Sequence, residues 1–341
     1  MSAPALQPVG ARDQADPGRQ AAAKKGGTGI TSRPWWPWAK RGTTVVFFAV
    51  VAYFTVRYAR NVDWDKVWSS ILATPRGVLY GAMAFAAASH ALYMCFDLLG
   101  RRYTGHKVPV LQVMQVNFIS YAFNLNMGSL VGGIAFRYRM YSGLGLDYPT
   151  ITRVVTLSML TNWLGYLVLA GAVFTFAPLA LPPDWKLSSQ GLQVLGVALL
   201  VVAALYFGKC ATAKERSVHI RGHELMLPPP RMALLQLVMS CTNWALISGV
   251  IYVLLQGRID YPSVLSVLLV AAVAGVITHV PAGLGVLEAV FVALLSHRVP
   301  EPQLIGALLT YRALYYIGPL LIAAVLYLLM ELRRRKVRSK G

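Results

Sequence analysis

Apolar residues dominate the chain in blocks of about 18 or more, the length that a helix needs to cross a hydrocarbon core of about 30 Å. The pattern predicts an all-α, polytopic membrane protein with about eight long transmembrane helices. We expect these helices near residues 43–58, 77–97, 109–127, 151–181, 191–208, 231–256, 262–280 and 303–330. A shorter amphipathic helix is expected between the first two, where Trp64, Val67 and Trp68 recur at helical spacing.

Composition and charge support this class. The chain is 56% hydrophobic and 13% charged, whereas soluble domains carry about a quarter charged residues. A net charge of +19 would favour a nucleic-acid partner for a soluble protein, but basic residues of membrane proteins gather in cytoplasmic loops. They cluster here before the first span, after the second and fifth spans, and at the C-terminus. The expected partners are therefore anionic lipid headgroups, and no nucleic acid is needed.

The pattern divides the chain into a membrane domain between two basic tails. Residues 1–41 are predicted to be a disordered tail, 42–332 the integral membrane domain, and 333–341 a basic C-terminal tail. The loops around Asp184 and Asp260 are poor in Lys and Arg, so we expect them outside and both termini in the cytoplasm.

This topology requires two extra returns of the chain, near 128–142 and 283–296. Both returns are too short to cross the membrane as one regular helix, and both begin with glycine-rich sequence. We therefore expect broken or re-entrant helices. Four pairs of turn and packing residues share a shift of 153 (262 − 109): Pro109 and Pro262, Gly132 and Gly285, Pro149 and Pro302, Gly165 and Gly318. The shift predicts an inverted repeat of halves 42–181 and 190–332, as in many secondary transporters.

Polar and ionisable side chains within apolar spans are candidates for function, because burying one in the membrane costs free energy unless it is paired or solvated by water. The candidates for substrate binding are Asn124, Asn126, Arg137, Arg139, His279, Glu288, Arg312 and Tyr315. Glu288 follows the second glycine-rich break, and Arg312 lies deep in the last span. We expect both to face one cavity; the alternative is a buried ion pair that only joins two helices.

Arg137 and Arg139 lie at the end of the first return, where they can bind a phosphate. They can equally mark the cytoplasmic face of a helix. Counting Arg137, Arg139 and Arg312 against Glu288 as the single embedded acid predicts a positively charged cavity. Guanidinium binds phosphate in a two-pronged geometry, so an anionic lipid is the expected substrate.

The other signals are weaker. Asn124 and Asn126 can hydrogen-bond a headgroup or tie helices together, and His279 is equally open. His219 and His223 have the i, i+4 spacing of a helical metal site, but they lack a third ligand in a basic loop, so no metal is expected. We find no P-loop, G-x-S-x-G, H-E-x-x-H or paired-carboxylate motif, so neither catalysis nor a cofactor is expected.

The glycine-rich breaks resemble those of a known family. The sequence from Asn126 through Gly132-Gly133 and Arg137 to Tyr141, and the later Pro281–Gly285 followed by Glu288 and Tyr311–Tyr316, is similar to the lysylphosphatidylglycerol synthase transmembrane-region family. The resemblance covers about 42–332 and is strongest to stand-alone inner-membrane members. It places the chain in a bacterial inner membrane.

The resemblance implies a function in lipid movement. In larger members the membrane module precedes a cytosolic aminoacyl-transferase domain and is associated with moving the modified lipid between leaflets. The present sequence ends at Gly341 without such a domain, so we expect a lipid transporter or flippase for an anionic phospholipid or lipid-linked phosphate. The alternatives are a non-catalytic scaffold or regulator that partners a lipid-synthesis enzyme, and a membrane-embedded transferase.

Overall fold

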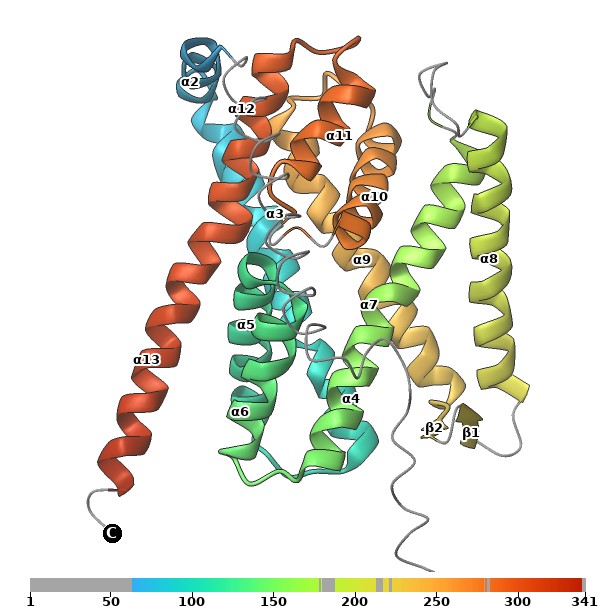
Figure 1. The fold of residues 1–341 in the computed structure, drawn as a ribbon, viewed down its shortest axis with the longest axis vertical. Coiled ribbons are helices and arrows are strands. Elements are labelled where there is room, and N and C mark those ends of the chain that lie inside the picture. Colours follow the sequence, from blue (N-terminus) through green and yellow to red (C-terminus); the bar gives the residue numbers. More distant parts are fainter. Residues whose placement is uncertain are drawn as a thin grey trace, which may run out of the picture. The chain divides into compact units, whose positions relative to one another are not determined.

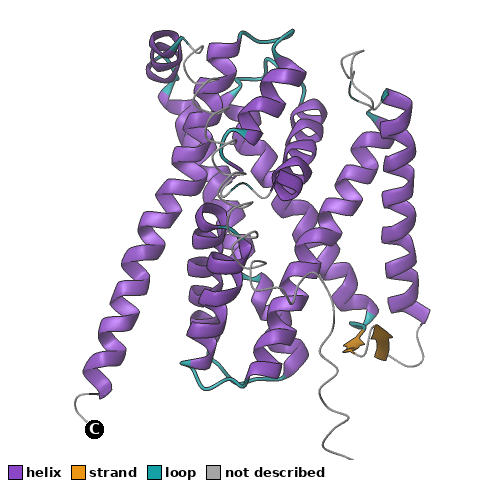
Figure 2. Ribbon diagram, in the orientation of Figure 1, coloured by secondary structure: helices purple, strands orange, loops and turns teal. Residues whose placement is uncertain are grey.

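The computed structural model describes residues 63–177, 179, 188–212, 217–220, 223–278, 280 and 283–338. Within these ranges the regular secondary structure is helical except for one short pair of strands (Figures 1 and 2). Six helices in the described part are long and apolar enough to cross a membrane: Arg76–Thr104, Tyr148–Phe176, Ser189–Thr212, Pro230–Leu254, Tyr261–Thr278 and Glu301–Leu332. The predicted all-α polytopic class is confirmed, while the predicted span 43–58 and tail 1–41 lie outside the described residues.

The elements follow one another along the chain with short connections. They are α2 (Trp64–Leu72), α3 (Arg76–Met94), α4 (Phe96–Thr104), α5 (Val110–Met127), the π-helical segment η3 (Ser129–Ala135), α6 (Phe136–Ser142), α7 (Tyr148–Phe176), α8 (Ser189–Thr212), β1 (Ser217–Ile220), β2 (His223–Met226), α9 (Pro230–Leu254), α10 (Tyr261–Thr278), α11 (Val286–Leu295), α12 (Glu301–Arg312), the π-helical segment η5 (Ala313–Ile317) and α13 (Gly318–Arg338).

The first predicted return is present as a helical hairpin. After α5 the chain turns at Gly128, which has a φ of 84°, and η3 and α6 run back along α5. A Cβ atom at Gly132 would overlap the backbone of Phe123 and Asn124, so only glycine permits this close return. In Figure 1 this hairpin begins and ends at the end of the bundle where α13 finishes, which we call the α13 end.

The second predicted return is a hairpin of α10 and α11, which pack against each other. Gly283 and Gly285 lie between the two helices with φ of 55° and 77°, a conformation that glycine adopts without strain. Figure 1 shows this hairpin beginning and ending at the opposite end of the bundle, where α2 lies, which we call the α2 end. The two hairpins therefore enter the bundle from opposite ends.

Helix boundaries recur along the chain at nearly constant spacing. α7 begins at Tyr148 and α12 at Glu301, which is 153 residues later (301 − 148). Their second residues are Pro149 and Pro302, where proline at the first turn favours a helix start. The order of a long helix, a hairpin and another long helix occurs twice in the described chain, first as α3 to α7 and then as α9 to α13.

A widened turn interrupts the last long helix. The π-helical segment η5 ends just before Gly318, and Pro319 follows. Proline lacks a backbone N–H and its ring collides with the carbonyl four residues earlier, so a regular α-helical turn cannot continue there. Tyr315 and Tyr316 lie in the widened turn.

The short helix α2 forms as expected and packs against α12. Val67 is buried at 1% exposure, whereas the side chains of Trp64, Trp68 and Leu72 are exposed. This outward apolar face is typical of a helix that lies in the membrane interface.

Two short strands, β1 and β2, lie where the spacing of His219 and His223 assumed a helix. β1 and β2 pair antiparallel, with His219 opposite Glu224 and Ile220 opposite His223. The helical i, i+4 spacing therefore does not apply to His219 and His223.

Candidate functional site

Each hairpin carries one member of a buried ion pair, and the first pair joins α6 to α4. The Nε atom of Arg137 lies 3.1 Å from Oδ2 of Asp97, and their side chains are 4% and 0% exposed. The hydroxyl of Tyr141 donates a second hydrogen bond to the same carboxylate oxygen, at 2.9 Å. Charges so deeply buried are tolerated only when they are paired and hydrogen-bonded.

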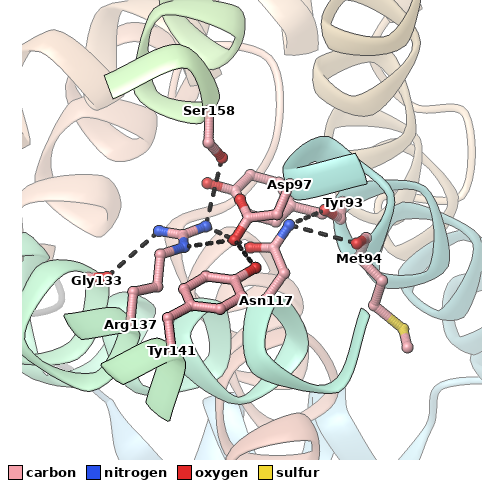
Figure 3. Close-up of polar contacts among 8 residues, drawn as sticks. All are labelled: Tyr93, Met94, Asp97, Asn117, Gly133, Arg137, Tyr141 and Ser158. Carbon is pink, nitrogen blue, oxygen red and sulfur yellow. Dashed lines mark hydrogen bonds and ion pairs between the residues drawn. The ribbon is translucent and has the colours of Figure 1, made fainter. Parts of the chain in front are cut away.

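The rest of the Arg137 guanidinium is held by neutral acceptors (Figure 3). It donates to the carbonyl of Gly133 at 3.3 Å, to the hydroxyl of Ser158 at 3.4 Å and to the side-chain oxygen of Asn117. Asn117 in turn donates to the carbonyl of Tyr93 at 2.6 Å. The cluster thus ties α3, α4, α5, η3, α6 and α7 together around one arginine.

The second pair joins α11 to α12. Arg312 contacts both carboxylate oxygens of Glu288, with Nη2 2.9 Å from Oε2 and with Nε bonded to Oε1. Nη2 also donates to the carbonyl of Gly283 at 2.8 Å, and the guanidinium lies 5.4 Å from the ring centroid of Tyr316. Glu288 and Arg312 therefore lie together in a buried ion pair, which is anchored at the glycine break that begins the return. That they face a substrate cavity stays a prediction.

A buried polar centre lies among α3, α5, α9 and η5. The hydroxyl of Tyr315 is 2.7 Å from that of Ser89 and 2.9 Å from that of Tyr121, and Ser89 donates to Asn243 at 2.8 Å. The ring of His90 lies 4.6 Å from that of Tyr315, centroid to centroid. Within the described residues, Nε2 of His90 and Nδ2 of Asn243 are buried without a hydrogen-bond partner.

Comparison with known proteins identifies the family. Residues 43–323 match the family described as the lysylphosphatidylglycerol synthase transmembrane region. The chain belongs to this family. It is therefore a membrane protein with a role in membrane lipid biology.

Individual relatives extend the match along most of the chain. Inner membrane protein YbhN of Escherichia coli K12 is 47% identical over 91% of this chain and 98% of its own length. The Synechocystis protein slr0712 is 32% identical over 80% of this chain and 88% of its own length. A phosphatidylglycerol lysyltransferase of Staphylococcus haemolyticus is 22% identical over 83% of this chain, but the match spans 33% of that protein.

The other predicted site residues have different surroundings. Arg139 has a side-chain exposure of 64% and lies 3.6 Å from Glu331 on α13, so the expectation of three converging arginines is wrong. Asn126 donates to the carbonyl of Tyr316 at 3.2 Å and ties α5 to η5. Asn124 is half-buried beside the glycines of η3, and His279 lies outside the described residues.

The charge count made from the sequence is also wrong, because it missed Asp97. The predicted second span ended at residue 97, which placed this acid at a membrane boundary. In the structure the helical path continues through α4 to Thr104, and Asp97 is wholly buried against Arg137. Each buried arginine thus has its own carboxylate, so these residues do not form a cavity with an excess of positive charge.

Proposed function

We propose that this protein moves a phospholipid between the two leaflets of the bacterial inner membrane. The observation that carries the proposal is the pair of hairpins that enter from opposite ends, each held by a buried arginine–carboxylate pair. The first hairpin reaches the polar centre, where Tyr121 contacts Tyr315 of η5, the segment that directly follows Arg312 of the second pair. Hairpins and broken helices of this kind are typical of proteins that pass a polar group across a membrane.

Two hairpins of opposite direction support a mechanism in which the protein opens alternately to the two leaflets. The element order repeats, α7 and α12 begin 153 residues apart (301 − 148), and the two hairpins point in opposite directions. An inverted repeat has two arrangements of similar energy, one open to each side, because each half can adopt the conformation of the other. A lipid headgroup would pass between the halves while its acyl chains stay in the bilayer.

The buried ion pairs provide a physical route for headgroup binding. A phosphate can replace the carboxylate of Asp97 or Glu288 on an arginine, because guanidinium pairs with either anion in the same forked geometry. Breaking a buried pair without a replacement costs about 3–5 kcal/mol. The pairs would therefore stay closed without lipid and open only when a phosphate takes the place of the acid.

The substrate that this proposal favours is phosphatidylglycerol or a lipid derived from it. The support is the similarity to proteins named phosphatidylglycerol lysyltransferase, together with the phosphate chemistry of Arg137 and Arg312. Because both arginines are balanced by acids, the preference does not come from an excess of positive charge.

The test is reconstitution of the full chain into liposomes that carry fluorescent phosphatidylglycerol, with dithionite used to quench the outer leaflet. We expect all of the label to become accessible in proteoliposomes and about half in protein-free liposomes. Arg312→Gln should slow the exchange, whereas Arg298→Gln, outside the buried pairs, should not. Equal accessibility with and without protein would overturn the proposal.

A non-catalytic scaffold for a lipid-synthesis enzyme is the competing function. The observation that favours it is that, in the described residues, each buried arginine is paired with a protein carboxylate and also donates to a backbone carbonyl. A scaffold would give no lipid exchange in liposomes, yet would copurify with an enzyme from native membranes.

The orientation is a separate part of the proposal. We place the α13 end, with the basic residues after α4 and at the end of α13, in the cytoplasm. In a variant lacking Cys95, Cys210 and Cys241, a cysteine at Asp260 should react with an impermeant thiol reagent in spheroplasts. A cysteine at Lys107 should not react, and the reverse pattern would invert the topology.

A further inference from the structure

A polar cavity lies at the α2 end, away from the buried ion pairs. It has a volume of about 480 Å³ and is lined by α2, the connection from α9 to α10, and the start of α12. Cavities of about 300–1,000 Å³ are typical of small-molecule sites. Ser69, Ser70 and Thr74 form one wall. The hydroxyls of Ser69 and Thr74 donate to the carbonyls of Lys66 and Ser70 at 2.9 and 3.1 Å, so the basic side chains of the lining are its main groups for binding a ligand.

The charged residues in this lining are both basic. Arg258 donates to the neutral side-chain oxygen of Gln303, and the neighbouring acid Asp260 is instead paired with Arg298 at 2.9 Å. Within the described chain, then, the guanidinium of Arg258 stands at the cavity with an amide rather than a carboxylate as its partner. A cation in this situation favours an anionic ligand.

Lys66 is the second cation of the lining, and it comes from a different element. Its Nζ atom lies 2.8 Å from Asp63. The hydrogen bond with Asp63 raises the pKa of Lys66 above its usual value, so the ammonium is charged at neutral pH. Arg258 and Lys66 thus approach the cavity from two sides.

The backbone at the cavity has an unusual conformation. Gln256, a lining residue, has a φ of 54° and is the non-glycine residue with positive φ in the part of the chain that the structure describes. Gly257 follows with a φ of 69°. Conformations of this kind persist where the surroundings determine them, and they cluster at ligand sites. Here the turn brings Gln256 and Arg258 into the same lining.

The position of the cavity indicates the source of its ligand. The adjoining helix α2 exposes Trp64 and Trp68 at 49% and 62%, and indole rings concentrate at the level of lipid headgroups. We infer that this cavity binds the phosphate of an anionic lipid headgroup at the α2 end, through Arg258 and Lys66. The inference goes beyond lipid movement, because a protein that does not translocate lipid can still hold a headgroup there.

The experiment measures binding to the full chain purified in a non-ionic detergent. Short-chain dioctanoyl phosphatidylglycerol, dioctanoyl phosphatidylcholine and inorganic phosphate are the three probes, and calorimetry gives their affinities. Arg258→Gln should weaken phosphatidylglycerol binding about tenfold or more, because it removes a charge-assisted hydrogen bond. Arg139→Gln, which removes an exposed arginine outside the cavity lining, is the control and should bind like the unmodified protein.

Each result bears on the inference. Loss of phosphatidylglycerol binding in Arg258→Gln, with weaker binding of phosphatidylcholine to the unmodified chain, would support it. If inorganic phosphate binds as tightly as phosphatidylglycerol, the ligand of the cavity is not specifically a lipid, and the inference is wrong on that point. Unchanged phosphatidylglycerol binding in Arg258→Gln would overturn the site. If Arg258→Gln is unstable in detergent, Lys66→Gln tests the same cavity from α2 and should also weaken binding.

The binding assay also separates this site from the proposed transport. Phosphatidylglycerol that binds through Arg258 without any exchange in liposomes would leave the cavity assigned and reject the transport proposal. Exchange that proceeds while no phosphatidylglycerol binds at Arg258 would reject the cavity alone.

Discussion

The two buried ion pairs occupy similar places in the two hairpins but assign the charges oppositely. In the first hairpin the returning helix α6 supplies the base, Arg137. The acid, Asp97, lies on α4, in the long span that precedes the hairpin. In the second the returning helix α11 supplies the acid, Glu288, and the long helix after it supplies the base, Arg312. The halves therefore share a means of holding a hairpin without sharing the residues that do so.

The surroundings of the two pairs differ as well. The side chains of Arg137 and Asp97 are 4% and 0% exposed, and the guanidinium has partners on four elements, α4, α5, η3 and α7. The side chains of Arg312 and Glu288 are 9% and 11% exposed, and the additional contacts of Arg312 include the carbonyl of Gly283 and the ring of Tyr316. The first pair is thus built into the packing, whereas the second lies at a break in the chain and is the easier of the two to open.

The largest expected effect is the loss of Arg137. Arg137→Gln leaves Asp97 buried without its cation, which should destabilise the protein by about 3–5 kcal/mol. Thermal unfolding in detergent measures the loss. Adding Asp97→Asn should recover part of it, because the double variant buries no charge. A double variant that is no more stable than Arg137→Gln would show that the pair is not the source of the stability.

A smaller loss is expected at the second pair. Glu288→Gln and Arg312→Gln should each destabilise the protein by about 3 kcal/mol, at the lower end of the range for broken buried pairs, since these side chains are less enclosed. The double variant should lose less than the two single losses added together. Strict additivity in the same unfolding assay would contradict a shared site.

The hydroxyl that connects the first hairpin to η5 should have an intermediate effect. Tyr315→Phe removes the hydrogen bonds to Ser89 and Tyr121 while keeping the ring, so a loss of about 1–2 kcal/mol is expected. Tyr252→Phe, which lies on α9 outside this centre, is the matched control. If both variants unfold at the same temperature as the unmodified protein, the hydroxyl contributes nothing to the link.

The smallest loss of stability is expected at Arg139, two residues after Arg137. Arg139→Gln removes an exposed contact with Glu331, and exposed pairs are worth about 0–1 kcal/mol. Its unfolding temperature should therefore stay close to that of the unmodified protein. A loss as large as that of Arg137→Gln would show that Arg139 has a structural role that its exposure does not indicate.

Much of this arrangement could be predicted from the sequence. Hydrophobic blocks gave the long helices, and the requirement for returns gave both hairpins, because glycine-rich segments cannot easily remain regular helices. The contact of Glu288 with Arg312 followed from the cost of burying either one alone. Their role in binding a substrate stays a prediction.

Residues that are neighbours in sequence are not always neighbours in space. Arg137 and Arg139 are two residues apart on a helix and so point in different directions, which was evident from the spacing alone. Asp97 was missed because hydropathy does not determine where a span ends when the helix bends and continues. The β-hairpin at 217–226 was missed because it is short and lies in a polar segment.

The order of charges along the chain has a consequence for biogenesis. In both pairs the carboxylate is synthesised first, Asp97 before Arg137 and Glu288 before Arg312. An arginine keeps its charge, and an unpaired charge is costly in lipid. Each arginine therefore enters the membrane when its partner is already there, and neither half of the protein has to hold an unpaired guanidinium in lipid while the ribosome completes the chain.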